Sequence, residues 1–241
     1  MRFFSSLPLT VHSEIELSDE VTHHLVRVLR SEIGARFFLF NGEGGMYEAE
    51  LIYAGKKQAR ARLLDFYPGD SESPLHTHLG QVMSKGDRMD YAIQKATELG
   101  VTEITPLFSE RCELRWRAEE RADRKLEHWR RVAISACEQC GRNRIPVIHE
   151  PLSLIEWLSV NCAELRLALI PTAARGLPAT NIPVRSAALL IGPEGGLSSN
   201  EIAAAQDAGF LPWQIGPRIM RTETAPVAAL AILQAHFGDF C

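Results

Sequence analysis

The chain has 241 residues, of which 46% are hydrophobic and 23% charged, a composition typical of folded globular proteins with a buried core. It contains no run of eighteen apolar residues and no N-terminal apolar stretch followed by a cleavage site, so neither a membrane span nor a signal peptide is predicted. Five cysteines in a chain of this length favour reduced thiols over a disulfide framework, and we expect a cytoplasmic protein.

The net charge of −4 argues, taken alone, against a nucleic-acid partner, because phosphate binding usually requires an excess of Lys and Arg. The distribution is uneven, however. Residues 85–144 hold thirteen Lys or Arg against eleven Asp or Glu, whereas residues 147–241 hold five against eight. This central concentration of basic residues is interpreted either as a nucleic-acid-contacting surface or as a solvated helix face that carries both signs of charge.

Residues 1–70 are predicted to form a compact, β-barrel-like domain with one helix. The runs ARFFLFNG, MYEAELIYA and QARARLLDF are apolar or alternating, and NGEGG and GKK separate them as turns. The segment SDEVTHHLVRVLR predicts a helix that Ser18 caps. The stretch 68–78, with two prolines, a glycine and small polar residues, predicts a linker. We therefore divide the chain into a first domain (1–70), a linker (71–78) and a second domain (79–241).

Strand and helix patterns alternate through residues 79–241. Such alternation predicts an α/β domain whose parallel sheet is covered by helices on both faces. The predicted strands are HLGQVMS, VTEITPLF, IPVIHE, LRLALIP, SAALLI and FLPWQIG. The predicted helices are DRMDYAIQKATELG, the long stretch 118–140, LSLIEWLS, SSNEIAAAQDAG and TAPVAALAILQAHF.

The most informative local feature is the segment LLIGPEGGLS at 189–198, in which a buried strand ends at a glycine-rich turn just before a helix. Open α/β sheets bind ligands beyond the carboxyl ends of their strands, and glycine lets a ligand approach bare backbone groups. The spacing does not match the dinucleotide fingerprint and no phosphate-loop lysine follows, so phosphate binding is not indicated. The turn is interpreted either as a binding loop for an adenine or ribose or as purely structural.

A second strand ends at glycine in QIGPRIMRTETA, residues 214–225, and a polar segment precedes the last helix. Thr222, Glu223 and Thr224 could simply cap that helix. Capping does not explain why Arg221 stands beside Glu223 directly after a buried strand. Paired charges in such a loop indicate a functional site.

The two loops IGPEGG and IGPRIMRTETA resemble the cofactor loops of the SPOUT superfamily of RNA methyltransferases. Within it, the sequence is most similar to the uridine-N3 methyltransferases of bacterial small-subunit (16S) ribosomal RNA. Further similar motifs occur in order along the whole chain: MRFF, HHLVRVLR, KGDRMDYAIQKATELGV, PLFSERC and ACEQCGR. The resemblance implies a PUA-like N-terminal β-barrel, a C-terminal α/β domain tied in a trefoil knot, and a homodimer. It also implies S-adenosylmethionine (SAM) as cofactor and 16S ribosomal RNA or the assembled small subunit as partner.

Carried over onto this sequence, the resemblance assigns three walls of a cofactor site. One wall follows the LRLALI strand, the second is the first glycine loop, and the third wraps the adenine with backbone contacts and apolar cover. The residues are Pro171 and Thr172, then Gly192, Gly195 and Gly196, then Ile215, Gly216, Ile219 and Met220. Ile215 and Met220 replace the Leu that is usual in the family, and both changes are conservative.

Methylation at N3 of uridine requires that a proton leave the base, because the protonated nitrogen is a poor nucleophile. We therefore assign Arg221 to stabilise the negative oxygen that develops, and Glu223 or a water to accept the proton. The alternative is that Arg221 forms a purely structural ion pair with Glu223 or Glu194. The acceptor base must be unpaired and splayed out, so arginines that stack on it and basic residues that bind phosphate are expected nearby. The candidate RNA contacts are Arg27, Arg30, Lys85, Arg88, Lys95, Arg142 and Arg144, each of which could instead be ordinary solvated surface.

Other motifs carry less weight. Cys137 and Cys140 have CxxC spacing, but no second pair follows, so no metal site is predicted. The pair His23 and His24 is expected on a helix surface, and His76 and His78 in the linker, without partners. The tryptophans are expected to be packing residues: Trp116, Trp129, Trp157 and Trp213.

Three alternative functions remain open from the sequence. The first is a methyltransferase that acts on another RNA base or a ribose hydroxyl. The second is an RNA-binding protein without enzymatic activity, and the third is a metabolic enzyme with a nucleotide cofactor. The intact glycine loops oppose the second, and the lack of a phosphate-binding fingerprint opposes the third.

Overall fold

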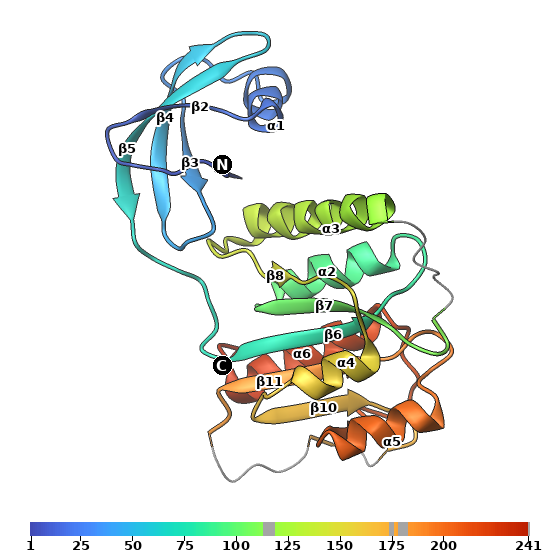
Figure 1. The fold of residues 1–241 in the computed structure, drawn as a ribbon. Coiled ribbons are helices and arrows are strands. Elements are labelled where there is room, and N and C mark those ends of the chain that lie inside the picture. Colours follow the sequence, from blue (N-terminus) through green and yellow to red (C-terminus); the bar gives the residue numbers. More distant parts are fainter. Residues whose placement is uncertain (113–118, 174–175, 178–182, 241) are drawn as a thin grey trace. The chain divides into compact units, whose positions relative to one another are not determined.

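The computed structural model describes residues 1–112, 119–173, 176–177 and 183–240, and within helix α3 it describes side chains from residue 123 onward. The chain divides into two compact units (Figure 1). Unit 1 comprises Met1–Glu72 together with Cys137–Ile145, and unit 2 comprises Ser73–Ala136 together with Pro146–Cys241.

Unit 1 contains a five-stranded sheet in the order β1-β3-β4-β5-β2. All neighbouring strands are antiparallel except β1 and β3. Burial alternates along β5, where Ala59, Ala61 and Leu63 face the core and Arg60 and Arg62 face solvent. The strand bounds are β1 (Arg2–Phe4), β2 (Glu14–Glu16), β3 (Arg36–Phe40), β4 (Met46–Ala54) and β5 (Ala59–Tyr67).

The helical segment of unit 1 begins as α1 (Asp19–Thr22) and continues as the π-helical turn η1 (His23–Val28). The Ser18 hydroxyl accepts a hydrogen bond from the Val21 amide at 3.3 Å, which confirms the predicted cap. The sequence pattern did not predict the change to π geometry. Val21 and Leu25 point into the core from this segment, so the segment covers the sheet's apolar face.

Residues 137–145 belong to unit 1, although the sequence pattern placed them in the second domain. The Arg2 guanidinium donates to the Arg142 carbonyl at 2.6 Å and to Asn143 Oδ1 at 2.5 Å. The Phe4 amide donates to Glu138 Oε1 at 2.8 Å. These bonds join segments more than 130 positions apart, which is why no local pattern indicated them.

Unit 2 contains a seven-stranded sheet in which every pair is parallel. The order is β12-β10-β11-β6-β7-β8, with β9 paired to β7, and the predicted parallel α/β sheet is confirmed. Strand β6 begins at His76, inside the segment that we predicted as linker. The bounds are β6 (His76–Val82), β7 (Glu103–Phe108), β8 (Val147–Ile148), β9 (Leu152–Ser153), β10 (Leu165–Leu169), β11 (Ser186–Ile191) and β12 (Leu211–Trp213).

Helices cover both faces of this sheet, as expected for a parallel sheet (Figure 1). Helix α2 (Arg88–Glu98) packs against α6 (Thr224–Phe237), and α4 (Leu154–Val160) packs against α5 (Ser199–Asp207). Helix α3 (Glu119–Cys140) contributes the buried Trp129. None of the helices in the described ranges is long and apolar enough to cross a membrane. The knot implied by the resemblance stays a prediction, since strand order does not define how the chain threads.

Candidate functional site

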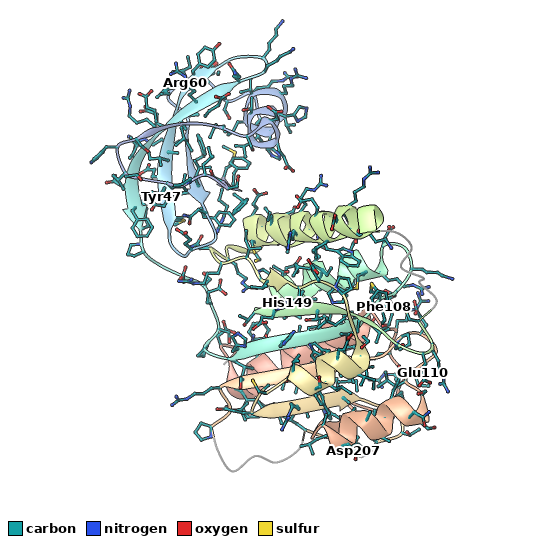
Figure 2. All side chains as sticks on the ribbon, viewed as in Figure 1. Tyr47, Arg60, Phe108, Glu110, His149 and Asp207 are labelled. Atoms are coloured by element: carbon teal, nitrogen blue, oxygen red, sulfur yellow. The ribbon has the colours of Figure 1, made fainter. Side chains whose placement is uncertain are left out.

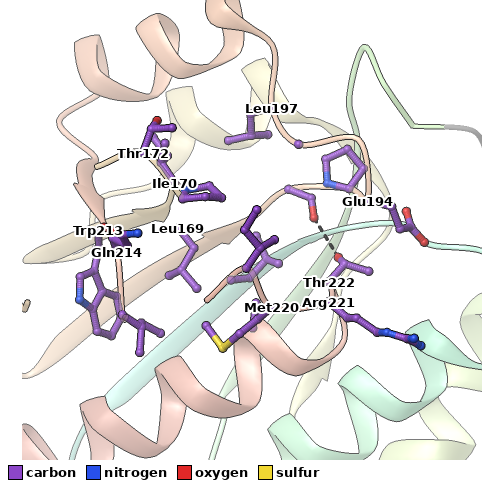
Figure 3. A pocket seen from close by; sticks show the side chains of 18 of the residues that line it. Leu169, Ile170, Thr172, Glu194, Leu197, Trp213, Gln214, Met220, Arg221 and Thr222 are labelled. Carbon is purple, nitrogen blue, oxygen red and sulfur yellow. Dashed lines mark hydrogen bonds between the residues drawn. The ribbon is translucent and has the colours of Figure 1, made fainter. Parts of the chain in front are cut away.

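A cavity of about 570 Å³ opens at the carboxyl ends of β10, β11 and β12 (Figure 3). Its walls are the segments that follow these three strands, at 169–172, 191–197 and 213–223. Its volume lies within the range of small-molecule sites, and its place at the strand ends is the usual one for ligands of open α/β sheets.

Thr222 joins two of these walls. Its hydroxyl donates to the Gly192 carbonyl at 2.8 Å, the bond dashed in Figure 3, and accepts from Gln81 Nε2 at 3.0 Å. Helix α6 begins after Glu223 without a side-chain cap bond, so the interpretation of Thr222 as a helix cap is wrong. Thr222 is 6% exposed, and its hydroxyl both donates and accepts a hydrogen bond within the protein. The bond to Gly192 fixes the first glycine turn against the second loop.

Two arginines contact the glycine turn that follows β11. Arg111 Nη1 donates to the carbonyls of Gly195 at 2.9 Å and Leu197 at 3.4 Å. Arg88 forms a salt bridge with Glu194 at 2.5 Å. Arg111 was absent from the predicted site residues, because nothing in its local sequence separates it from the neighbouring arginines.

The predicted cofactor residues converge on this cavity. Gly195 is the exception, since it does not line the cavity and its carbonyl faces Arg111. The residues that do line it are Pro171, Thr172, Gly192, Gly196, Ile215, Gly216, Ile219 and Met220. Sequence reasoning missed several apolar side chains of the same walls, among them Leu169, Ile191, Leu197, Ile202 and Trp213. For Leu169, Ile191 and Trp213 the signal was the apolar end of a predicted strand, which the sequence analysis interprets only as core. Leu197 and Ile202 lie in the turn and the helix that follow β11.

Arg221 and Glu223 both line the cavity. Among the residues that the structure describes, the Arg221 guanidinium has no hydrogen-bond or ion-pair partner, and Glu194 pairs with Arg88 instead. The alternative in which Arg221 forms a structural pair with Glu194 or Glu223 is therefore wrong for this structure. Glu223 Oε2 is buried and likewise lacks a partner in the described ranges. Both groups remain available to a ligand.

A groove of about 890 Å³ adjoins the cavity and shares Arg88, Arg221 and Glu223 with it. Lys85 and Tyr91 line the groove as well. The structure thus brings two of the predicted RNA contacts, Lys85 and Arg88, beside the predicted catalytic pair.

The other predicted RNA contacts are not among the residues that line this groove. Lys95 is bound to Glu98 of the same helix at 2.7 Å. Arg27 and Arg30 are exposed residues of unit 1. Arg144 forms an ion pair with Asp70 at 3.1 Å. Each of these four side chains is still reached by solvent, so their contact with RNA stays a prediction.

Arg142 requires a correction. It is 4% exposed and forms a salt bridge with Glu72 at 2.6 Å, so its charge is compensated inside unit 1. A buried guanidinium that is paired with a carboxylate does not present its charge to a phosphate, and removing one partner of such a pair is strongly destabilising. The CxxC pair also has a structural role, since Cys137 is buried and its thiol donates to the Arg144 carbonyl at 3.5 Å. Burial raises the pKa of the Cys137 thiol to about 12.

The interpretation of His76 and His78 as unpartnered linker residues is wrong. Both lie at the start of β6, and His78 contacts Thr105, Trp157 and a cluster around Glu103. Trp157 is buried, as are Trp129 and Trp213, so the predicted packing role is confirmed for these three tryptophans. Trp116 lies outside the described residues.

Comparison with protein families matches both parts of the chain. Residues 71–234 match the family model described as an RNA methyltransferase domain, and residues 17–64 match the one described as an RNA methyltransferase PUA domain. The first match covers more than half of the chain. Together they confirm the fold that the resemblance implied, in which a PUA-like N-terminal region precedes an α/β methyltransferase domain.

Individual relatives agree with the family models. A Buchnera aphidicola (subsp. Schizaphis graminum) protein named ribosomal RNA small subunit methyltransferase E is 37% identical and covers 99% of this chain and 97% of its own length. The Neisseria gonorrhoeae protein of the same name, solved with S-adenosyl methionine, has a TM-score of 0.92 at 38% identity, covering 100% of this chain and 99% of that one. A Legionella pneumophila methyltransferase solved with SAM has a TM-score of 0.93 at 40% identity, covering 99% and 98%. The resemblance stated from the loops is confirmed.

Proposed function

Because this chain belongs to the RNA methyltransferase family, we propose that it transfers a methyl group from SAM to N3 of a uridine in 16S ribosomal RNA. The observation that carries the proposal is the glycine-lined cavity at the carboxyl edge of the sheet, which is also lined by Arg221, a guanidinium without a partner among the residues that the structure describes. The relatives named ribosomal RNA small subunit methyltransferase E support the choice of RNA, and two related structures contain SAM.

The residues of the cavity fit SAM chemically. Gly216 has open space where a side chain would stand, so a ligand can approach its backbone closely. Trp213, Leu169 and Ile191 provide apolar surface for an adenine, and the indole N–H of Trp213 is buried without a partner among the described residues. Ile219 lines the cavity yet is 83% exposed, and we expect its side chain to become covered on binding. When bound, SAM supplies a methyl group on a positively charged sulfur.

Arg221 is assigned to the uridine. Loss of the N3 proton places negative charge on the base, and the Arg221 guanidinium, which has no partner in the described part of the chain, stabilises that charge in the transition state. Glu223 is assigned as proton acceptor, either directly or through a water, because its buried Oε2 has an unused lone pair within the described structure. Thr222 and Arg111 position the loops around this pair through their bonds to the glycine turn.

The adjoining groove is assigned to the RNA strand around the target uridine. Lys85 and Arg88 line it and can bind phosphate, and Tyr91 offers an aromatic face, 46% exposed, on which a splayed base can stack. A homodimer is part of the proposal, as the resemblance to the family implies.

Transfer to a different RNA nucleotide is the second candidate function. The guanidinium of Arg221 would stabilise negative charge on any deprotonated base, so the groove by itself does not select N3 of uridine.

The test is methyl transfer from labelled SAM into small ribosomal subunits that lack their natural modification, followed by identification of the methylated nucleoside. We expect 3-methyluridine. Another methylated nucleoside would move the assignment to the second candidate. SAM binding without incorporation would redirect the search to other RNAs, and absence of SAM binding would overturn the proposal as a whole.

A further inference from the structure

A second cluster of polar side chains lies at the opposite edge of the same sheet, at the amino ends of β6 and β7 and just after β8. It contains His78, Glu103 and His149, whose possible ligand atoms all lie within 4.8 Å of one another. His78 is the register partner of Glu103, and Ile148, which precedes His149, is the register partner of Ile104. Figure 2 labels His149 at this edge.

The cluster follows from strand periodicity. Side chains two positions apart point to the same face of a strand, so His76 and His78 share one face of β6. Glu103 and Thr105 share the corresponding face of β7. Parallel register then brings the imidazoles of neighbouring strands to the same carboxylate.

The contacts inside the cluster are short. His149 Nε2 lies 2.5 Å from Glu103 Oε2, and His76 Nε2 lies 3.1 Å from Glu103 Oε1. The Trp157 indole donates to His78 Nε2 at 3.1 Å, and Thr105 Oγ1 lies 2.8 Å from the same nitrogen. Each carboxylate oxygen of Glu103 therefore faces one imidazole, while His78 is oriented by its neighbours.

The hydrogen bonds of the cluster leave His78 able to bind a metal. An indole N–H only donates, so His78 Nε2 must carry a lone pair. A lone pair on an imidazole nitrogen is what a metal ion requires of a histidine ligand.

We propose that His78, Glu103 and His149 bind a divalent transition-metal ion of the Zn²⁺ type, and that a water or His76, which lies beside Glu103, completes its coordination. Two or three imidazole nitrogens and one carboxylate oxygen suit Zn²⁺ and related ions, whereas Mg²⁺ and Ca²⁺ require mainly oxygen ligands. This inference is independent of the proposed function, because the proposed methyl transfer uses the other edge of the sheet.

The geometry allows such an ion to enter. Bonds of about 2.0–2.2 Å in a tetrahedral site separate ligand atoms by about 3.3 Å. The His149–Glu103 and His76–Glu103 pairs, at 2.5 and 3.1 Å, must therefore open by less than about 1 Å. The other ligand atoms of the cluster lie within 4.8 Å of one another, so they must close by at most about 1.5 Å. A cavity of about 610 Å³, lined by these side chains, gives the ion a route from solvent. The indole bond to His78 is displaced if Nε2 becomes the ligand atom.

The test uses full-length, tag-free protein stripped with a chelator and dialysed against Zn²⁺, with bound metal quantified. We expect one Zn²⁺ per chain. His149→Ala and Glu103→Gln should each weaken binding by at least about 100-fold, beyond the 10–100-fold typical of losing an outer hydrogen-bond partner. His128→Ala is the matched control, since His128 and Asp90 form a histidine–carboxylate pair at 2.6 Å that belongs to no metal-ligand cluster among the described residues, and it should bind Zn²⁺ like the wild type.

Co²⁺ provides a second readout that needs no variant, because a four-coordinate Co²⁺ site absorbs visible light strongly and hydrated Co²⁺ does not. Circular dichroism is recorded before the binding measurement to show that each variant is folded. If His149→Ala does not fold, Zn²⁺ binding by Glu103→Gln decides the test. Binding of less than one Zn²⁺ per chain would overturn the proposal, as would unchanged binding in both variants. Either result would mean that the cluster is a hydrogen-bonded group only.

Discussion

The two edges of the unit 2 sheet present different kinds of chemical group. At the carboxyl edge, the chain offers mainly backbone groups and apolar side chains, since glycine turns follow β11 and β12. At the amino edge, it offers imidazole and carboxylate side chains that project from the first residues of β6 and β7. The first chemistry suits an organic ligand with an adenine, and the second suits a cation. A parallel sheet thus provides two distinct sites because all strands begin at one edge and end at the other.

The largest expected effect tests the carboxyl edge. Arg221→Ala should lower the methyl-transfer rate by about 10²–10³-fold and leave SAM affinity nearly unchanged, because the guanidinium stabilises charge that develops only in the transition state. Single-turnover kinetics and calorimetric SAM titration measure the two quantities. Arg185→Ala, an exposed arginine elsewhere in unit 2, is the control. Activity within a few-fold of the wild type would contradict the assignment.

The second prediction concerns the pH dependence of the free energy of unfolding, which the amino edge should influence through His78. The folded-state pKa of His78, about 4, lies below its ordinary 6.5, so between these pH values the unfolded chain binds a proton that the folded chain does not. In metal-free protein the free energy of unfolding should therefore fall as the pH is lowered from about 6.5 to about 4, by on the order of 3 kcal/mol. Urea unfolding across this range measures it.

His78→Gln is the matched variant, because an amide oxygen still accepts from the Trp157 indole while the titratable group is gone. Its free energy of unfolding should vary less steeply over the same pH range. An equal slope in both proteins would show that other groups cause the acid sensitivity.

A smaller effect concerns the link between the glycine loops. Thr222→Val removes the donor to the Gly192 carbonyl and the acceptor for Gln81, so we expect a loss of about 1–3 kcal/mol in the free energy of unfolding. SAM affinity should fall with it, since the first turn loses its anchor. Thermal melts and SAM titration provide the measurements, with the exposed Thr224→Val as control. Equal behaviour of the two variants would remove Thr222 from the site.

The smallest expected change in stability belongs to Arg88→Ala. Arg88 forms a salt bridge with Glu194, and the two side chains are 45% and 42% exposed. Such exposed pairs contribute at most about 1 kcal/mol to the free energy of unfolding. RNA methylation should nevertheless fall through a weaker affinity for RNA, and the salt dependence of RNA binding should decrease. Arg131→Ala, whose arginine pairs with Glu127 on α3, is the control. Unchanged RNA affinity would exclude Arg88 from the groove's function.

The two edges also differ in how far the sequence predicted them. The glycine turns and the buried strand before each are contiguous in the chain, so LLIGPEGG and QIGPRIMRTETA indicated the carboxyl edge directly. The bonds of Thr222 and Arg111 cross between loops and were missed, because they depend on which strands become neighbours. The amino-edge cluster joins residues 78, 103 and 149 through strand register, and His76 and His78 had been interpreted as linker. Local pattern predicted elements, whereas long-range register determined the side-chain partners.

The most direct test of the central claim is SAM titration of a variant that fills the carboxyl-edge cavity. A Cβ at Gly216 meets open space, so Gly216→Val should occupy the ligand's volume without disturbing the fold. Gly69→Val is the matched control, because Gly69 also has open space around it and lies in unit 1. We predict that the wild type and Gly69→Val bind one SAM per chain with equal affinity. The affinity of Gly216→Val for SAM should be lower by at least about 10-fold, which corresponds to about 1.4 kcal/mol of binding free energy. Wild-type affinity in folded Gly216→Val would contradict the account.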